Sequence, residues 1–425
     1  MKKILLFGAG KSATGLIRYL VSETAARNWQ LIVADGNLSL AASKIGHAAH
    51  AKAVTLQIED EQEREALVRD ADIVISLMPP ALHFLVAQSC IKCSKHLLTA
   101  SYLDDKMRSL EPAIQEQGLL FLCEMGLDPG IDHMSAMQLI HHIGQEGGSI
   151  RSFHSHTGGL VSPESDNNPW HYKISWNPRN VVMAGSAGAK YRENGQEITK
   201  SYEQLFENCR EVSVEGIGRL AWYPNRDSLS YIPIYGLEQT ADFIRTTLRY
   251  PAYCRAWKSI VKAGLTDDQT PIQTSGHSFT QWSAPIRPFV NVENKTQLEF
   301  LGLFDDSPIP TSAKTSADIL QYLLEYKLAM QPHDKDMIVM LHEITYKDNA
   351  GNLREIKSSL VVHGEDHLQT AMAKTVGLPL GIAALLILEG QIGLRGLHIP
   401  ILPAIYEPVL KELAIQGVRF QETVS

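Results

Sequence analysis

Asp128 is the residue whose position most clearly suggests chemistry. It lies in the segment Gly126-Leu127-Asp128-Pro129-Gly130, directly after the apolar residues 119–123. A strand that ends in such a turn, followed by a helix, places a carboxylate at the carboxyl edge of an α/β sheet, where ligands bind. A carboxylate at that edge can take up a proton from a bound small molecule.

Two other predicted strands end in polar residues. Ser76 follows an apolar strand that stops at Pro79-Pro80, and Thr99-Ala100-Ser101-Tyr102 ends the next strand. These residues are expected along the same edge as Asp128. Ser76 and Thr99 could equally serve as local turn formers. We predict Tyr102 and Asp128 as the catalytic pair, with Ser76 as a cofactor contact.

The beginning of the chain predicts a site for a dinucleotide. The apolar residues 2–7 lead into Gly8-Ala9-Gly10-Lys11-Ser12-Ala13, and Leu16, Ile17 and Leu20 then follow helical spacing. This G-x-G-x-x-A pattern gives a tight turn, close approach of the backbone to a pyrophosphate and small-residue packing. An ATP-type phosphate loop is excluded because Leu5 stands where that loop needs glycine. The predicted cofactor contacts here are Gly8, Gly10, Lys11, Ser12 and Ala13.

Asp35 follows the second predicted strand, residues 31–34. An acidic residue at this position accepts hydrogen bonds from the adenosine ribose and repels a 2′-phosphate. The sequence therefore favours NAD over NADP as the cofactor. The alternative is a plain turn aspartate before Gly36-Asn37.

Regular alternation of strands and helices over the first third predicts a Rossmann fold, which is a doubly wound parallel sheet. The expected helices are residues 38–46, 59–69, 81–90 and 104–117, and the expected strands are 2–7, 31–34, 53–58, 72–78, 96–101 and 119–123.

The remainder predicts a second, mixed α+β domain. Residues 150–156 suggest a strand before a Gly- and Pro-rich loop at 157–169, and residues 239–262 contain a helical stretch. A hairpin is expected from 337–346 and 353–363. Predicted helices at 371–389 and within 397–416 follow. We expect a dinucleotide-binding domain of residues 1–130 and 391–425. Residues 131–390 should form a substrate and dimerisation domain, with a small helical subdomain around 239–270.

The composition is typical of a globular enzyme, with 425 residues, 44% hydrophobic and 20% charged. The net charge of −8 argues against a nucleic-acid surface. Residues 376–388 are too short for a bilayer span and contain Pro379, so no membrane contact is expected. Five scattered cysteines fit a reducing cytoplasm, and the Cys90-x-x-Cys93 pair has no visible partners for a redox or zinc role.

Arginines near predicted turns are candidates for binding substrate carboxylates, because guanidinium binds carboxylate in a bidentate fork. They are Arg226, Arg245 and Arg249, and for any one of them a solvated surface position is the alternative. His154 and His156 alternate along one predicted strand. With no third ligand identified in the sequence, no metal is expected.

Together these residues resemble the saccharopine dehydrogenases of the L-glutamate-forming type. The resemblance extends over nearly the whole chain and depends on six segments: Gly126 to His133, Thr99 to Tyr102, Gly158-Gly159 with Pro163-Glu164, Tyr172 to Trp176, Tyr223 to Ser228, and Thr247 to Tyr250.

The resemblance implies hydride transfer to NAD or NADP in lysine metabolism. Saccharopine and water would give L-glutamate and 2-aminoadipate 6-semialdehyde through an imine. It also implies a cleft between two domains, a homodimer and a small-molecule substrate. Gly8, Gly10, Lys11 and Ser12 would hold the pyrophosphate. Ala100, Ser101, Leu127, Asp128 and Pro129 would lie by the nicotinamide, with Ser175 as a further cofactor contact. Ser101, Tyr102, Asp128, Arg226, Thr247 and Arg249 would line the substrate.

Two departures from the family pattern matter. Members that use NADP usually have Arg just after the second strand, where this chain has Asp35-Gly36-Asn37. Other members have Cys in place of Thr157, so no thiol role is carried over. The alternatives to this function are a carboxyspermidine-type imine reductase and a non-catalytic nicotinamide-binding protein.

Overall fold

The computed structural model describes residues 1–425, which form two compact units. The first unit comprises Met1–His142 and Leu368–Arg419. The second comprises Ile143–His367 and Phe420–Ser425. The chain therefore leaves the first unit and returns to it, and its last residues go back to the second.

A seven-stranded sheet forms the centre of the first unit, in the order β16-β6-β5-β4-β1-β2-β3. All of its neighbouring strands are parallel. The central strands are continuous apolar runs because helices cover both faces of such a sheet. The strands are β1 (Lys3–Phe7), β2 (Gln30–Asp35), β3 (Ala51–Thr55), β4 (Ile73–Ser76), β5 (His96–Thr99), β6 (Leu120–Leu122) and β16 (Gly396–His398).

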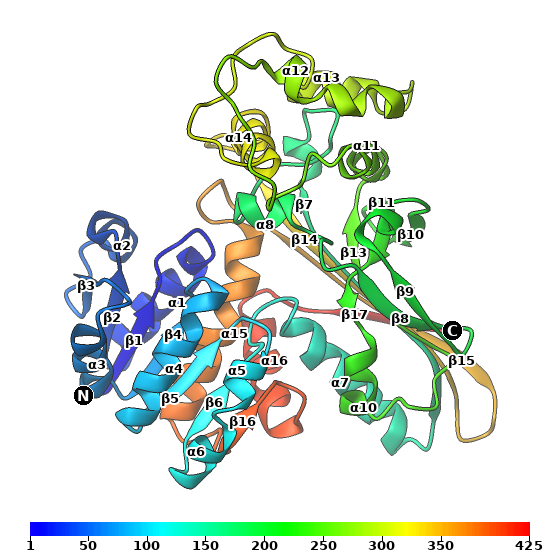
Figure 1. Cartoon of the computed structure of the whole chain (residues 1–425). Coiled ribbons are helices and arrows are strands. Elements are labelled where there is room, and N and C mark those ends of the chain that lie inside the picture. The colour runs from blue at the N-terminus through cyan, green and yellow to red at the C-terminus, as the bar shows by residue number, and fades with distance from the viewer. The chain divides into compact units, whose positions relative to one another are not determined.

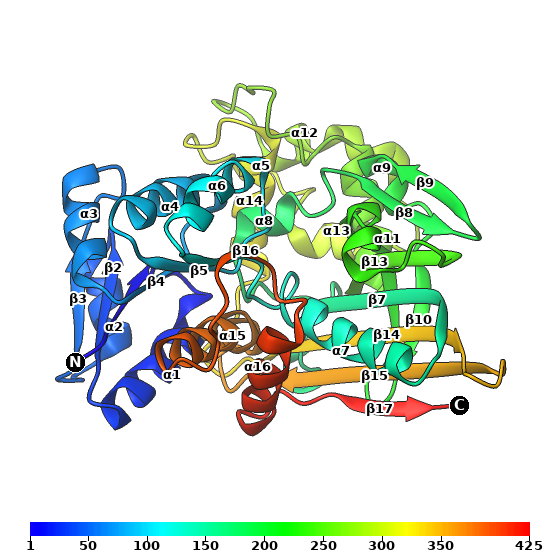
Figure 2. The same cartoon turned by 90° about the horizontal axis from the view of Figure 1, so that it is seen from below.

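Helices pack on both faces of this sheet, which confirms the predicted doubly wound Rossmann arrangement (Figure 2). One layer contains α1 (Ala13–Ala26), α15 (Ala371–Leu388) and α16 (Pro403–Ile415), and the other contains α3 (Glu61–Asp70) and α4 (His83–Lys92). The remaining helices of this unit are α2 (Leu38–Ile45), η1 (Pro80–Leu82), α5 (Asp105–Arg108), α6 (Glu111–Glu116) and the greater part of α7 (Ile131–Gln145).

The position of α15 differs from the expected domain division. The expectation assigned residues 371–389 to the second domain, but α15 packs along α1 in the first unit (Figure 1). Glycines permit this close approach. A Cβ added at Gly377 would lie 2.7 Å from the backbone nitrogen of Leu16, and one at Gly15 would lie 2.7 Å from the carbonyl oxygen of Ala373. The close packing of α15 on α1 through these glycines therefore decides the boundary between the units.

α15 runs without interruption through Pro379, in agreement with the helix predicted at 371–389. By length and hydropathy it is the one helix that could cross a membrane, and 72% of it is buried within the protein. A buried core helix of a globular protein meets the same criteria, so this finding is weak evidence for a membrane span.

Two other expectations in the first unit need correction. Residues 104–117 form two short helices, α5 and α6, with Pro112 in the first turn of the second. Residues 396–398 form strand β16 instead of a helix, because they pair in parallel with β6 at the sheet edge. A three-residue strand depends on that pairing and has no pattern of its own.

The second unit is built on a ten-stranded mixed sheet, with β10-β11-β13-β7-β14-β15-β17 as its main path and β8, β9 and β12 beside it. Figure 2 shows β7, β14, β15 and β17 running side by side. The strands are β7 (Ser149–Val161), β8 (Ala189–Glu193), β9 (Gln196–Lys200), β10 (Arg210–Val214), β11 (Gly218–Pro224), β12 (Arg226–Asp227), β13 (Asp242–Arg249), β14 (Asp336–Lys347), β15 (Leu353–His363) and β17 (Gln421–Val424).

The predicted hairpin is confirmed as β14 and β15, which pair from Met337↔His363 to Lys347↔Leu353. Other segments differ from expectation. Residues 157–161, expected as loop, continue β7. The helical stretch expected within 239–262 is α11 (Pro251–Lys262), whereas residues 242–249 form β13 and pair in parallel with β7. The C-terminal β17 pairs with β15, so residues 420–425 belong to this unit and not to the nucleotide domain.

A helical region covers part of this sheet and is larger than the predicted subdomain at 239–270. Its aromatic core includes Trp170, Tyr172, Tyr253 and Trp257. The helices of the second unit are α8 (Pro178–Val182), α9 (Tyr202–Leu205), α10 (Ile232–Tyr235), α11 (Pro251–Lys262), α12 (Phe279–Trp282), α13 (Lys295–Leu301) and α14 (Ser316–Lys327), with short turns η2 (Pro163–Ser165), η3 (Leu229–Tyr231) and η4 (Ala284–Phe289).

Candidate functional site

The predicted cofactor residues of the first unit lie along one edge of its sheet. Because β6, β5, β4, β1 and β2 are parallel neighbours, the segments that follow them emerge at the same edge. In spatial order they are Asp128 after β6, Ser101 and Tyr102 after β5, Ser76 at the end of β4, Gly8 to Gly10 after β1, and Asp35 at the end of β2. β1 is the switch point at which successive strands diverge to opposite sides, and it is the usual place for a dinucleotide.

The turn after β1 has room for a pyrophosphate. Gly10 is exposed, and a Cβ added there would meet no atom within 4 Å. The turn is anchored to the end of β2, because the Gly8 amide donates a hydrogen bond to the carbonyl oxygen of Ala34 at 2.8 Å. Helix α1 begins at Ala13, so the first helical amides point towards this space. These residues fit a dinucleotide.

The carboxylate of Asp35 accepts hydrogen bonds from two backbone amides near the predicted dinucleotide turn. Its Oδ2 accepts a hydrogen bond from the Ala9 amide at 2.7 Å, and its Oδ1 accepts one from the Asn37 amide at 2.8 Å. Lys44 of α2 donates to the carbonyl oxygen of Gly10. Burial lowers the pKa of Lys44 to about 8, against the opposing effect of Asp35. The site thus contains an ammonium group close to the phosphate turn, which the sequence alone did not reveal.

A buried histidine links two of the predicted cofactor residues. His83 Nδ1 lies 2.8 Å from Ser76 Oγ, and His83 Nε2 lies 2.7 Å from Ser101 Oγ. Burial lowers the pKa of His83 to about 4, so the ring is neutral near pH 7. The ring fixes both hydroxyl groups where β4 and β5 end. Sequence reasoning missed His83, although its place just after Pro79-Pro80, at the start of a helix, was a usable signal.

The structure brings the predicted catalytic pair together. Tyr102 Oη donates to Asp128 Oδ1 at 3.1 Å. The Asp128–Pro129 peptide is cis, and the turn closes when the Gly126 amide donates to the carbonyl oxygen of Pro129 at 2.9 Å. Gly130 has a φ of +147°, and a Cβ there would lie 2.1 Å from the carbonyl oxygen of Gly126. The Gly-bracketed turn therefore requires glycine at this position.

Buried Glu124 braces the loops that carry this pair. Its Oε1 accepts from the Leu103 amide at 3.0 Å, and its Oε2 lies 2.7 Å from His133 Nε2. Its amide donates to the carbonyl oxygen of Ser101 at 3.1 Å. These hydrogen bonds join the segment after β5, which carries Tyr102, to the segment after β6, which carries Asp128. This supporting role was also missed in the sequence.

Two of the predicted substrate residues of the second unit lie on one face of its sheet. Thr247 and Arg249 alternate with Thr246 and Leu248 along β13 and therefore share a face. Thr247 is opposite Tyr223, and Arg249 is opposite Ala221. That face adjoins the aromatic core of the helical region.

Arg249 is a buried cation without a carboxylate counter-ion. Arg249 is 3% exposed, and its Nη1 donates a hydrogen bond to the carbonyl oxygen of Leu248 at 2.8 Å. The guanidinium carbon lies 5.3 Å from the ring centre of Tyr172 and 5.4 Å from that of Tyr253, and Nε has no hydrogen-bond partner. Burial opposes the charge, yet the surrounding tyrosines keep the pKa of Arg249 above its ordinary value. A desolvated guanidinium with donors to spare is suited to bind an anion.

The other predicted residues of this unit lie elsewhere. Arg226 is exposed in β12 and has a φ of +51°. Its turn adjoins Arg245, since the Asn225 amide donates to the carbonyl oxygen of Arg245 at 2.8 Å. Arg245 itself is buried over the ring of Tyr231 at 4.6 Å. Ser175 is buried next to Ile174, whose backbone bonds to Leu328.

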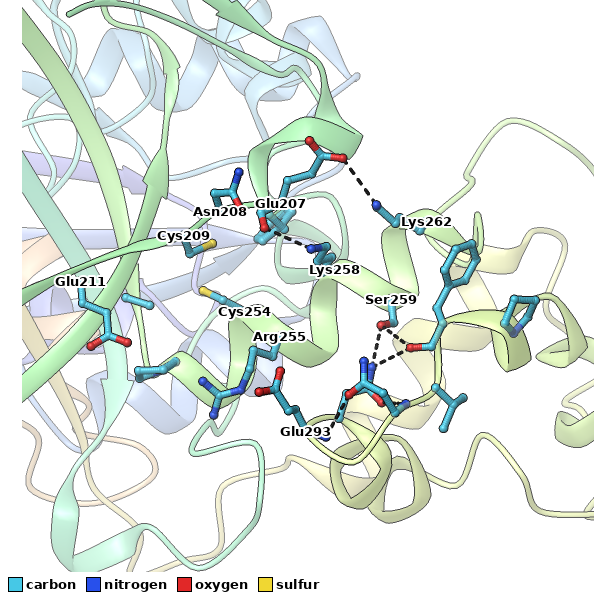
Figure 3. A pocket seen from close by; sticks show the side chains of 18 residues that line it. Glu207, Asn208, Cys209, Glu211, Cys254, Arg255, Lys258, Ser259, Lys262 and Glu293 are labelled. Carbon is cyan, nitrogen blue, oxygen red and sulfur yellow. Dashed lines mark hydrogen bonds and ion pairs between the residues drawn. The ribbon is translucent and has the colours of Figure 1, made fainter.

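A separate hollow in the helical region contains none of the predicted site residues (Figure 3). Its cations are offset by acidic groups: Lys262 lies 3.4 Å from Glu207, and Glu211 and Glu293 also line the hollow. Cys209 and Cys254 face one another there as free thiols. The mixed charge gives no clear preference for a ligand.

Two family models match the chain. The saccharopine dehydrogenase NADP binding domain matches residues 4–122, and the saccharopine dehydrogenase C-terminal domain matches residues 126–418. These matches cover both structural units. They also name NADP, so the preference for NAD inferred from Asp35 has no support from them.

Curated relatives include the mitochondrial alpha-aminoadipic semialdehyde synthase of Bos taurus, 33% identical over 99% of this chain and 47% of the relative. The chain thus spans about half the length of that relative. Saccharopine dehydrogenase [NADP(+), L-glutamate-forming] of Schizosaccharomyces pombe is 31% identical over 100% of this chain and 99% of the relative.

The solved structure of apo saccharopine dehydrogenase (L-Glu forming) from Saccharomyces cerevisiae superimposes with a TM-score of 0.89, at 31% identity and full coverage of both chains. A homospermidine synthase from Legionella pneumophila, at 8% identity and a TM-score of 0.60, shares the fold alone. The two matched domains, the full-length relatives and the site at the sheet edge agree: this chain belongs to the saccharopine dehydrogenase family.

Proposed function

We propose that the chain is an NAD(P)-dependent oxidoreductase that interconverts saccharopine with L-glutamate and 2-aminoadipate 6-semialdehyde. The observation that carries the proposal is the hydrogen-bonded Tyr102–Asp128 pair, which stands at the sheet edge of a chain matched to this family in both units. Fungal relatives with this named activity match over nearly their full length.

The chemistry requires proton transfers close to the reacting carbon. The secondary amine of saccharopine loses a proton, and the adjacent carbon gives a hydride to the oxidised nicotinamide, which leaves an imine. Water adds to the imine, and the resulting carbinolamine breaks down to an amine and an aldehyde. In this proposal Asp128 accepts the proton from the amine, and the hydrogen bond from Tyr102 orients its carboxylate. Ser76, His83 and Ser101 keep the neighbouring strand ends in position.

Saccharopine also carries three carboxylates. Arg249 suits one of them, because a buried guanidinium without a carboxylate partner gains more from an anion than a solvated one. We assign the second carboxylate to Arg226, which is exposed on a different turn of the same unit. Two cationic contacts at separate positions favour a polyanionic amino acid over a polyamine, which distinguishes this function from carboxyspermidine-type reduction.

For the cofactor, we propose that Asp35 and Lys44 together govern the choice between NAD and NADP. Asp35 disfavours a 2′-phosphate by charge, whereas Lys44 brings an ammonium group to the same turn. The names of the fungal relatives favour NADP, and the preference for NAD depends on Asp35 alone. Initial rates with each cofactor at matched concentrations test this directly.

A homodimer in the cytoplasm completes the proposal. All five cysteines are free, and Cys90, Cys123 and Cys254 are buried, which is compatible with a reducing compartment. Light scattering on the purified chain measures the oligomeric state, and a monomeric mass at micromolar concentration would rule out the dimer.

The test of the function is turnover. Purified protein should reduce the nicotinamide when given saccharopine, and should release equal amounts of L-glutamate. Reaction with carboxynorspermidine and not with saccharopine would replace the proposal by the polyamine alternative. Cofactor binding without turnover of either compound would leave a nicotinamide-binding protein.

A further inference from the structure

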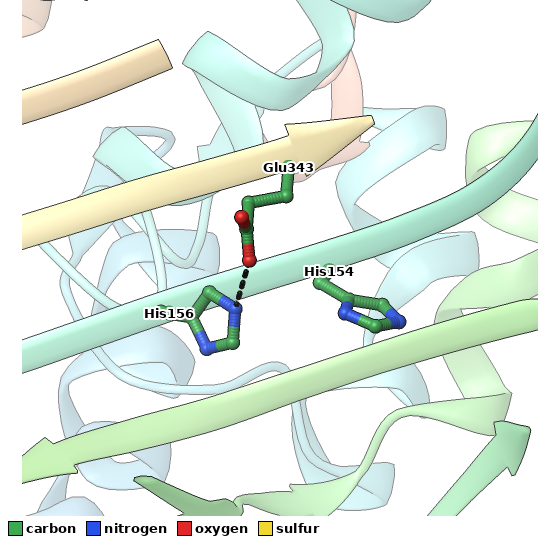
Figure 4. Close-up of side chains that lie close together, drawn as sticks. All are labelled: His154, His156 and Glu343. Carbon is green, nitrogen blue, oxygen red and sulfur yellow. Dashed lines mark ion pairs between the residues drawn. The ribbon is translucent and has the colours of Figure 1, made fainter. Parts of the chain in front are cut away.

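Two histidines and a glutamate meet on one face of the sheet of the second unit. His154 and His156 lie on β7, and Glu343 of β14 is the direct cross-strand partner of His154. Side chains two residues apart on a strand share a face, so all three point to the same side of the sheet (Figure 4). Glu343 comes 187 residues after His156 in the chain, and its proximity was invisible in the sequence.

The spacing of the donor atoms approaches that of a metal site. His156 Nε2 lies 3.3 Å from Glu343 Oε2, and one donor atom from each of the three residues lies within 4.8 Å of the others. Zinc bonds to nitrogen and oxygen of roughly 2.0–2.2 Å in a tetrahedron separate neighbouring donors by about 3.3–3.5 Å. His156 Nε2 and Glu343 Oε2 are therefore already at the separation of two zinc ligands. The His154 ring needs to move towards these two atoms by about 1–2 Å to become the third ligand.

The second polar atom of His156 and of Glu343 makes a hydrogen bond that orients the side chain. His156 Nδ1 lies 2.7 Å from Thr246 Oγ1, which leaves Nε2 directed at the cluster. Glu343 Oε1 accepts from Lys357 Nζ at 2.7 Å, which leaves Oε2 directed at the cluster. Metal-bound histidines and carboxylates are typically oriented by such outer hydrogen bonds.

A simple ion-pair network explains His156, Glu343 and Lys357, but it leaves His154 unexplained. The ring of His154 makes no hydrogen bond and is held edge-on to His156, with ring centres 6.1 Å apart. Its ring nitrogens are therefore available to a metal ion.

We propose that His154, His156 and Glu343 bind one divalent transition-metal ion of the zinc class. Ions of the zinc class bind a set of two imidazoles and one carboxylate more readily than calcium or magnesium ions do. The ion would tie β7 to β14 and leave one coordination position for water. Thr246 alternates with Thr247 along β13, so the site lies on the opposite face of that strand from Thr247 and Arg249. It is therefore separate from the proposed substrate contacts.

The experiment uses the full-length chain without a histidine tag, stripped of metal by dialysis against a chelator. Cobalt(II) chloride is titrated in while the visible absorption of tetrahedrally coordinated cobalt is recorded, and zinc chloride is then added as a competitor. We expect one cobalt ion per chain, displaced by one zinc ion. His154→Gln and Glu343→Gln should each weaken cobalt binding by about 100-fold or more, because each removes one of three ligands.

Two further variants separate a built site from surface binding and from unfolding. His47→Gln removes an exposed histidine and should bind cobalt as the wild type does. Thr246→Val keeps all three ligands and the side-chain shape, and should weaken binding by about 10- to 100-fold through loss of the hydrogen bond to His156. Circular dichroism checks the fold of each variant. Fewer than one equivalent bound by the wild type, or equal binding by wild type, His154→Gln and Thr246→Val, would overturn the proposal.

Discussion

Replacement of Arg249 by methionine should separate substrate binding from stability. In the structure the guanidinium is almost fully buried, donates to the Leu248 carbonyl and stacks near two tyrosine rings, with no carboxylate beside it. Hydrogen bonds to a charged partner contribute about 1.5–3 kcal/mol, so their loss should raise the dissociation constant for saccharopine by about 10- to 150-fold. Methionine fills a similar volume.

The same change should cost little folding free energy. Burying an uncompensated charge is penalised by several kcal/mol, whereas two cation–π contacts return about 1–2 kcal/mol each when desolvated. The free energy of unfolding of Arg249→Met should therefore equal or exceed that of the wild type. Isothermal calorimetry with saccharopine and urea unfolding measure the two quantities.

Arg219→Met is the matched control. Its side chain is 76% exposed and lies 2.9 Å from Glu211, so neither binding nor stability should change measurably. An unchanged dissociation constant in a folded Arg249→Met protein would refute the assignment. A loss of several kcal/mol of stability with normal saccharopine binding would assign Arg249 a purely structural role.

Four other changes have defined outcomes. Asp128→Asn should lower kcat by about 10²- to 10⁴-fold, and near-normal turnover would remove it from proton transfer. Arg226→Ala should raise the saccharopine KM and spare cofactor binding, so an unchanged KM would exclude it from the site. Asp35→Ser should shift kcat/KM towards NADP by about tenfold or more, and a constant NADP to NAD ratio would contradict the ribose contact. Gly377→Ala should destabilise the protein by about 1–3 kcal/mol through its clash with α1, whereas Gly144→Ala, which meets no atom within 4 Å, should leave melting nearly unchanged.

Much of the first unit was predictable because its signals are local. A buried parallel strand is a continuous apolar run, and the glycine turn at Gly8 to Gly10 and the Asp128 turn follow such runs directly. Parallel topology then brings the strand ends to one edge, so the prediction that Tyr102 and Asp128 meet required no knowledge of long-range packing. The errors in this unit came from long-range packing, as in residues 396–398, whose strand exists only through pairing with β6, and in α15, whose place beside α1 was not predicted.

The sequence by itself determined the alternation of strands and helices, the dinucleotide turn and the chemical types at the sheet edge, because each depends on residues close together in the chain. Tertiary structure alone decided that α15 packs on α1, that Arg249 is buried without a counter-ion, that His83 joins Ser76 to Ser101, and that Glu343 reaches His156. These facts arise from contacts between distant segments, where burial removes water and a side chain's charge or hydrogen bonds are satisfied only by what the fold places beside it.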